Sequence, residues 1–174
     1  MSKEPLSFNL EGAEALKSVF RNHASGITVV TSSTDQGEPI GFTASSVTSL
    51  GSNPPLVSLN IAQGSSSYQH LYPGKLVAIH TLDSEALWLA EKMAAVKAQR
   101  FTDVDYLIGP ENTPYFPEVP AILLARVRSR TEVEANAVVI LDAETAASQS
   151  VAEEPLVYFQ RGYHTLGSRL KDNF

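Results

Sequence analysis

A run of hydroxyl side chains at residues 41–50, GFTASSVTSL, is the first feature of the sequence that could do chemistry. Five of its ten residues are Ser or Thr. In an extended strand, Thr43 and Ser45 point to one face, whereas Ala44 and Ser46 point to the other. Small polar residues at the end of an apolar strand let a flat ligand approach the backbone closely and hydrogen-bond to it. On composition alone, however, a solvent-facing edge strand and turn is the better explanation.

A second hydroxyl cluster, GSSSY at residues 64–68, opens a predicted short helix that extends to Tyr72. Serine hydroxyls, the free N–H groups of a helix N-terminus and the helix dipole all favour a bound anion. The alternative is plain N-capping by one serine. Three consecutive serines are more than one cap requires, so both interpretations stay open.

A third candidate is the pair Arg100-Phe101, which follows the predicted longest helix directly. That helix begins at Asp83 or Ser84 and runs to about Gln99. An arginine in this place can bind the C-terminal carbonyls of the helix or reach an anionic ligand. Taken alone, the capping role is the better explanation.

Other catalytic machinery is hard to find in the sequence. There are no cysteines, which excludes a disulfide framework, a thiolate nucleophile, Cys-ligated zinc and iron–sulfur clusters. The four histidines lack metal-site spacing, and no Ser/His/Asp order or carboxylate pair stands out. We therefore expect no metal site and assign no catalytic side chain. An enzyme built on this chain would leave the reaction to an organic cofactor.

Length and composition predict one soluble domain covering residues 1–174. The chain has a mass of 18.8 kDa, a hydrophobic fraction of 43% and a net charge of -6, which disfavours a general role in nucleic-acid binding. No segment approaches about 18 uninterrupted apolar residues, and the N-terminus lacks an apolar run. We expect no membrane span, no signal peptide and a cytoplasmic location.

The hydrophobic pattern predicts a mainly β chain. Strands are expected at 27–33, 39–48, 56–61, 76–81, 121–133, 137–142 and 156–160. A further helix is expected from about residue 10 to 20, capped by Asn9, and residues 103–120 should form a long surface excursion. In the strand 121–133, Arg126, Arg128 and Arg130 should share one face. Because most strands are joined as hairpins and no G-x-G-x-x-G is present, the order favours an antiparallel barrel with helices against it over a Rossmann fold.

Five segments in this order resemble the flavin reductase family of split-barrel proteins: FRNHASGITVVTS, GFTASSVTSLGSNPPLVSLNI, SSSYQHL, RF and PLVYFQRGYHTL. The order and spacing match over roughly residues 16–166. The run FTASSVTSL followed by PPLV is the most specific part. The resemblance implies a homodimeric, split antiparallel β-barrel that binds FMN, or alternatively FAD, with NADH or NADPH as the electron donor.

The resemblance also assigns site residues. It implies that the isoalloxazine ring and ribityl chain of the flavin contact Thr43, Ala44, Ser45 and Ser46, and that Asn60 belongs to the cofactor site. It implies that the flavin phosphate is bound by Ser65 and Ser67, with Arg100 and Phe101 near it. On the nicotinamide or substrate side it places Asn136 and, close to the mouth of the site, Tyr163.

The sequence departs from the family pattern at two places. Where family members often carry Lys or Arg beside the phosphate-binding serines, this chain has Gln63, Gly64 and Ser66. Where they commonly carry Gly-Asp-His, it has Glu134-Ala135-Asn136. Asn can donate and accept hydrogen bonds but cannot become cationic, so the second departure bears on nicotinamide use.

Three functions are therefore open. The first is an NAD(P)H:flavin reductase that passes hydride from nicotinamide C4 to flavin N5 and could serve a flavin-dependent monooxygenase. The second is a flavin-binding split-barrel protein without nicotinamide-driven reductase activity, which the change to Asn136 favours. The third is a flavin oxidase-like relative acting on a small organic substrate. The fold alone does not separate them.

Overall fold

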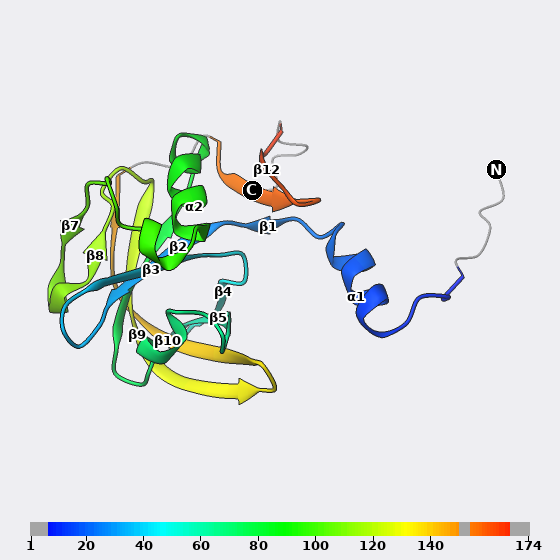
Figure 1. Ribbon diagram of the computed structural model, residues 1–174, viewed down its shortest axis with the longest axis horizontal. Helices are drawn as coiled ribbons and strands as arrows, with labels where there is room; N and C mark the ends of the chain where they lie inside the picture. Colours follow the sequence, from blue (N-terminus) through cyan, green and yellow to red (C-terminus); the bar gives the residue numbers. More distant parts are fainter. Residues whose placement is uncertain (1–6, 150–153, 168–174) are drawn as a thin grey trace.

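Strands make up most of the regular secondary structure in the computed structural model, which describes residues 7–149 and 154–167 (Figure 1). The strands are β1 Ser25–Gly26, β2 Thr28–Ser33, β3 Pro39–Ala44, β4 Thr48–Ser52, β5 Pro55–Ala62, β6 Leu76–Thr81, β7 Leu107–Ile108, β8 Pro114–Tyr115, β9 Ala121–Val133, β10 Asn136–Ser148, β11 Leu156–Phe159 and β12 Gly162–Thr165. The helices are α1 Gly12–Phe20 and α2 Leu87–Ala94, with short 3₁₀ turns η1 Tyr68–His70, η2 Ser84–Ala86, η3 Lys97–Gln99 and η4 Pro110–Asn112.

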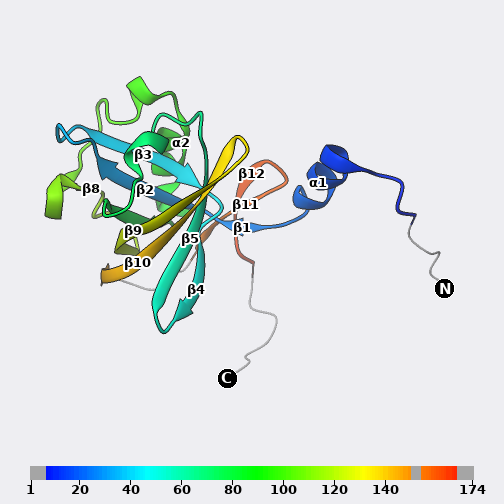
Figure 2. The same cartoon turned by 90° about the horizontal axis from the view of Figure 1, so that it is seen from below.

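The main sheet is a seven-stranded antiparallel sheet in the order β3-β2-β6-β9-β10-β5-β4. Its two edges, β3 and β4, are consecutive in the chain and are joined only by residues 45–47. In a flat sheet the edges would lie about 29 Å apart, whereas this link can span only about 14 Å. The sheet must therefore curl until its edges come close (Figures 1 and 2). The result is an open, split barrel, as predicted.

The inner face of the curled sheet forms the first hydrophobic core. On β5, the side chains of Val57, Leu59 and Ile61 are buried, which confirms the predicted alternation. They pack with buried residues of β2, β3, β6, β9 and β10. On β9, Arg126 and Arg128 face outward and form ion pairs with carboxylates of β10. On β9 and β10 the outer face is thus charged and the inner face apolar, as expected for one packed side of a sheet.

A second core lies between α2, β2 and the segment that follows α2. Leu89, Ala90 and Met93 of α2 are fully buried there. Phe116, from the region expected to be a surface excursion, is also buried, with an exposed fraction of 1%. That expectation was therefore wrong in part: Pro and Gly make the segment irregular, yet it supplies a central aromatic side chain.

The predicted helices are shorter than expected. The helix predicted from residue 83 to 99 is broken into η2, α2 and η3, because Ala95 and Val96 have extended backbone with ψ of 175° and 146°. The serine cluster does not open an α-helix; only the single turn η1 follows it. The helix N-terminus predicted for an anion is therefore absent at residues 64–72, and α1 has Glu11 rather than Asn9 at its N-cap position.

The strand boundaries also differ in places. The strand predicted at 39–48 ends at Ala44, and a separate edge strand, β4, begins at Thr48. Strand β10 continues to Ser148, beyond the predicted end at residue 142. A small sheet in the order β1-β11-β12 includes β12, which the sequence did not predict. Within the described residues, no helix has the length and apolar character needed to cross a membrane.

His80 of β6 is a completely buried titratable side chain beside the second core, with its ring centroid 5.8 Å from that of Phe116. The backbone N–H of Phe116 donates to its Nε2 at 3.1 Å, and its Nδ1 lies 2.9 Å from the carbonyl oxygen of Val29. This pattern fits a neutral imidazole that donates from Nδ1 and accepts at Nε2. Burial lowers the pKa of His80 from its usual value of 6.5 to about 4.

We expect the free energy of unfolding to fall on acidification because of His80. The pKa is depressed in the folded state, so this stabilisation is complete above pH 6.5 and is lost as the pH falls towards 4. A difference of this size corresponds to about 3 kcal/mol. Urea unfolding at pH 7 and pH 4.5 measures the loss, and His80→Gln should lose less stability over that interval. Equal losses in both proteins would contradict the assignment.

Candidate functional site

A cavity of about 380 Å³ opens at the split of the barrel, where β3 ends and β5 passes beside it. Its size lies within the usual range for small-molecule sites. It is lined by Phe42, Thr43, Ala44, Ser45, Ser46, Asn60, Ile61, Ala62, Ser65, Met93, Ala94 and Arg100. The fold thus brings together seven of the predicted site residues. They come from β3 and the residues just after it, from β5, from the turn that carries Ser65, Ser66 and Ser67 (the serine turn), and from the segment after α2.

Two hydroxyls of the 43–46 segment serve the architecture of the cavity. Ser46 Oγ donates to the carbonyl oxygen of Asn60 at 3.1 Å and accepts from its backbone N–H at 3.0 Å, which joins the two sides of the split. Thr43 Oγ1 donates to the carbonyl oxygen of Ala90 at 2.5 Å and joins β3 to α2. Ser45 is exposed, and its hydroxyl makes no hydrogen bond within the described part of the chain. Ser45 and the backbone are therefore the groups available to a ligand.

Arg100 lies at one end of the cavity and connects three parts of the site. Its Nε donates to the carbonyl oxygen of Ala95 at 2.8 Å, and its Nη1 donates to that of Gly41 at 2.7 Å and to Ser66 Oγ at 3.4 Å. Partial burial lowers the pKa of Arg100, although arginine stays protonated in proteins. Among the described residues, Nη2 has no hydrogen-bond partner, so this cation keeps donors for an anionic ligand.

The serine turn and Lys97 surround a small adjoining pocket. This pocket is lined by Pro39, Ile40, Gly41, Ser66, Ser67, Lys97, Arg100 and Phe101. Ser67 is buried; its N–H donates to Ser65 Oγ at 3.3 Å and its hydroxyl donates to the carbonyl oxygen of Gly41 at 3.5 Å. Two cations and three serines therefore meet at the same end of the cavity, an arrangement suited to a phosphate.

Gly41 and Phe101 form the floor beneath this end of the site. A Cβ atom on Gly41 would lie 3.0 Å from Met93 Sδ and 3.1 Å from Phe101 Cζ, so only glycine fits without displacing them. The ring of Phe101 stacks on Phe116 with centroids 6.2 Å apart. Phe101 thus packs against β3 at Gly41, and it lines the adjoining pocket rather than the larger cavity.

Asn136 and Tyr163 lie outside the lining of both pockets. Asn136 is exposed at the start of β10 and pairs with Ala62, which does line the larger cavity. Tyr163 lies on β12, where its ring packs edge-on against Tyr158 at 5.5 Å and burial raises its pKa. Asn136 is therefore one strand away from the cavity, while Tyr163 belongs to the second core.

Sequence reasoning missed several residues of the site. Lys97, Met93 and Ala94 enter it from α2 and η3, and Gln63 binds the turn that carries Asn136. Lys97 lies one helical turn before Arg100, so a basic pair at i and i+3 was a usable signal. For the contact that Gln63 makes, the sequence offered no such signal, because the partners of Gln63 are more than 70 residues away in the chain.

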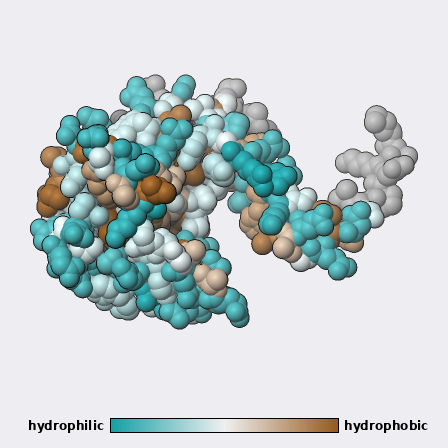
Figure 3. Space-filling view, in the orientation of Figure 1, coloured by the Kyte–Doolittle hydropathy of each residue, from teal (hydrophilic) through white to brown (hydrophobic). Residues whose placement is uncertain are grey.

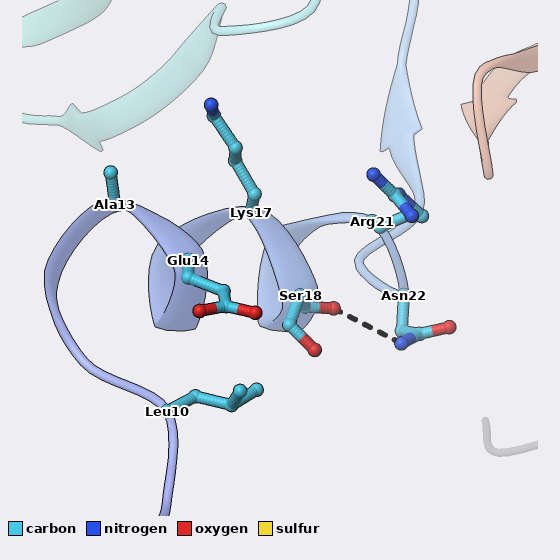
Figure 4. Close-up of a pocket in the computed structure, with 7 residues that line it drawn as sticks. All are labelled: Leu10, Ala13, Glu14, Lys17, Ser18, Arg21 and Asn22. Atoms are coloured by element: carbon cyan, nitrogen blue, oxygen red, sulfur yellow. Dashed lines mark hydrogen bonds between the residues drawn. The ribbon is translucent and has the colours of Figure 1, made fainter.

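A larger hollow, of about 620 Å³, lies elsewhere, along α1 (Figure 4). All its lining residues come from α1 and its immediate flanks: Leu10, Ala13, Glu14, Lys17, Ser18, Arg21 and Asn22. The hydrogen bond drawn there, from Asn22 Nδ2 to the carbonyl oxygen of Ser18 at 3.2 Å, is local to the helix end. Among residues 7–149 and 154–167, no second element lines this hollow, so the cavity at the barrel split is the better candidate site.

The curled antiparallel sheet with a cavity at its split defines the class of split-barrel proteins, and comparison with known proteins identifies the family within that class. Residues 20–167 match the family described as flavin reductase like domain. The structure of a flavin reductase domain protein from Arthrobacter sp. FB24 aligns with a TM-score of 0.84 and 30% identity, covering 92% of this chain and 98% of that one. The chain belongs to the flavin reductase family, as its sequence motifs predicted.

Two curated relatives show how far the similarity extends. An "NADH:FMN oxidoreductase" of Rhodococcus erythropolis is 32% identical over 152 residues, which cover 85% of this chain and 79% of the relative. A "probable flavin reductase" of Rhizobium meliloti is 32% identical over 151 residues, 87% of this chain. The chain spans only 48% of the length of the Rhizobium protein.

Proposed function

We propose that this protein is an NAD(P)H-dependent flavin reductase, which transfers hydride from a reduced nicotinamide nucleotide to FMN, with FAD as the alternative flavin. The observation that carries the proposal is the cavity at the barrel split. It combines a wall of backbone and small side chains at residues 43–46 with serines and Arg100 at one end. A flat ring that carries a phosphate on a flexible chain has the shape and charge this arrangement suits.

The residues present fit a flavin, which when bound would supply the redox chemistry. Backbone groups of residues 43–46 and the Ser45 hydroxyl would contact the ring, with Asn60 opposite them. Ser65, Ser67 and Arg100 would hold the phosphate, and Gly41 leaves room for the side chains that support this end. The protein's part in the reaction is to bind and orient two rings, a role that requires no strong side-chain acid or base.

The nicotinamide side is assigned to the face near Asn136. Asn136 begins β10 and pairs with Ala62, which lines the cavity, so Asn136 lies one strand away from it. Its amide can hydrogen-bond to a carboxamide but carries no charge at any pH. Tyr163 is proposed at the mouth on the family resemblance alone. The neutral Asn136 is also the observation that favours the second candidate function, a flavin-binding protein without nicotinamide-driven turnover.

A flavin-dependent monooxygenase is the partner we propose for the reduced flavin. Relatives include the reductase component of a 4-nitrophenol monooxygenase system from Rhodococcus opacus, which is 30% identical over 164 residues. Another is the reductase component of a trigonelline monooxygenase from Acinetobacter baylyi, 28% identical over 150 residues. The cytoplasmic location that we also propose is supported by the cysteine-free sequence.

We also propose a homodimer, supported by the exposed apolar residues of α1. No residue of this helix is buried, and Leu16, Val19 and Phe20 have exposed fractions of 59%, 65% and 60%. Figure 3 shows this helix extending from the body with hydrophobic residues on its surface. A second copy of the chain would cover them. Gel filtration at the mass of a monomer would contradict the proposal.

The function is tested by adding flavin and nucleotide to the purified protein. We expect oxidation of NADH or NADPH, followed by absorbance at 340 nm, to depend on both the protein and FMN or FAD. Flavin binding without nucleotide oxidation would reject the reductase and favour the second candidate function. Absence of flavin binding would reject both.

A further inference from the structure

Gln63, which directly follows β5, binds three successive carbonyl groups of the turn between β9 and β10. Its backbone N–H donates to the carbonyl oxygen of Ala135 at 2.9 Å. Its side-chain Nε2 donates to the carbonyl oxygens of Glu134 at 2.7 Å and Asn136 at 3.1 Å. Both side-chain amide protons are therefore directed at this one turn.

The turn needs such support because its backbone is unfavourable for its residues. Val133 and Asn136 form the last pair of the hairpin, so Glu134 and Ala135 make a two-residue turn. Glu134 has φ of +51°, in the left-handed region that favours glycine. Two-residue hairpin turns normally place Gly, Asn or Asp at such positions. Here the conformation is maintained without them, and the hydrogen bonds from Gln63 supply the external support.

The turn lies beside the candidate site. Asn136 pairs with Ala62 of β5, and Ala62 lines the larger cavity together with Asn60 and Ile61. A shift of the turn would therefore move Asn136 relative to the rim of the cavity. Because Gln63 is itself outside the lining of the cavity, its removal would act on Asn136 through the turn.

We infer that Gln63 is a positioning residue, which holds the 134–136 turn so that Asn136 faces the nicotinamide nucleotide. This inference rests on the proposed function. It predicts an effect on the use of the nucleotide that is separate from flavin binding, since the phosphate end and the 43–46 wall do not contact Gln63 through any side-chain hydrogen bond in the described residues.

The test is Gln63→Glu, which preserves shape but replaces two donors with a carboxylate facing carbonyl oxygens. Displacement of a positioning group by about 1 Å can cost up to about 100-fold in rate, so we expect KM for the nucleotide to rise at least about tenfold. The dissociation constant for FMN should change less than about twofold. Gln63→Met, which removes the donors without adding a charge, should raise KM for the nucleotide in the same way. Gln36→Glu, the same change in an exposed turn, is the matched control and should leave KM unchanged.

Hydrogen exchange of the flavin-free protein provides a readout independent of activity. In Gln63→Glu, amides of residues 133–138 should exchange faster than in the wild type. Faster exchange with an unchanged KM would overturn the inference, because the contact would then be only structural. A rise in the FMN dissociation constant by the same factor as the rise in KM for the nucleotide would also overturn the inference. An inactive wild-type protein would instead reject the proposed function.

Discussion

Replacing Arg100 with methionine is expected to lower the affinity for FMN by about 10- to 100-fold. A hydrogen bond to a charged group contributes about 1.5–3 kcal/mol, and each 1.4 kcal/mol is about tenfold in affinity. Arg100 lines both pockets, and its Nη2 has no partner in the described residues, so its charge and Nη2 donors are available to a ligand. Methionine fills similar space but offers neither.

Riboflavin distinguishes a phosphate contact from general damage at this site. It lacks the phosphate, so its affinity should change less than about threefold in Arg100→Met. Equal losses for FMN and riboflavin would contradict the phosphate assignment. Loss of the bonds to Gly41 and Ala95 should also lower the free energy of unfolding by about 1–3 kcal/mol. Arg100→Lys keeps the positive charge but lacks the planar guanidinium, so its FMN affinity should lie between those of the wild type and Arg100→Met.

The second large effect is expected from Ser45→Tyr, which should reduce FMN affinity by about 100-fold or more. The side chain at residue 45 is exposed and lines the cavity, so a phenol ring there occupies the space proposed for the isoalloxazine ring. Because the residue lies outside both hydrophobic cores, the change in the free energy of unfolding should stay within about 0.5 kcal/mol. FMN fluorescence titration and urea unfolding measure the two quantities.

Ser49→Tyr is the matched control for this substitution. Ser49 is exposed on β4, four residues further along the same segment, and does not line the cavity. Its replacement should leave FMN affinity within about twofold of the wild type. If Ser45→Tyr also bound FMN normally, Ser45 would be ordinary edge-strand surface and the ring would have to lie elsewhere.

Local patterns predicted β5 and the middle of β9 well because these strands bury one face. Residues 56–61 and 125–130 largely alternate between apolar and polar side chains, and both lie in strands with the predicted faces. The break between α2 and η3 was not predictable in the same way. The break accompanies a long-range arrangement, in which Arg100 donates both to the carbonyl oxygen of Ala95 and to that of Gly41 on β3.

The site was predicted in part for a similar reason. Residues 43–46 form a compact motif, and its resemblance to the family pattern, rather than its composition, marked these residues as the wall of the site. The contact between Gln63 and the 134–136 turn instead depends on the pairing of β5 with β10, which juxtaposes residues distant in the chain. The prediction that the serines lie near Arg100 is confirmed. The prediction that they open a helix is wrong, because only the single turn η1 follows them.

The most direct test of the central claim, that the cavity at the barrel split binds flavin, is a crystal structure of the protein with FMN. We predict that the isoalloxazine ring lies against residues 43–46 and that the phosphate lies within hydrogen-bonding distance of Ser65 and Arg100. Flavin bound at any other place, or no flavin at saturating FMN, would contradict the account.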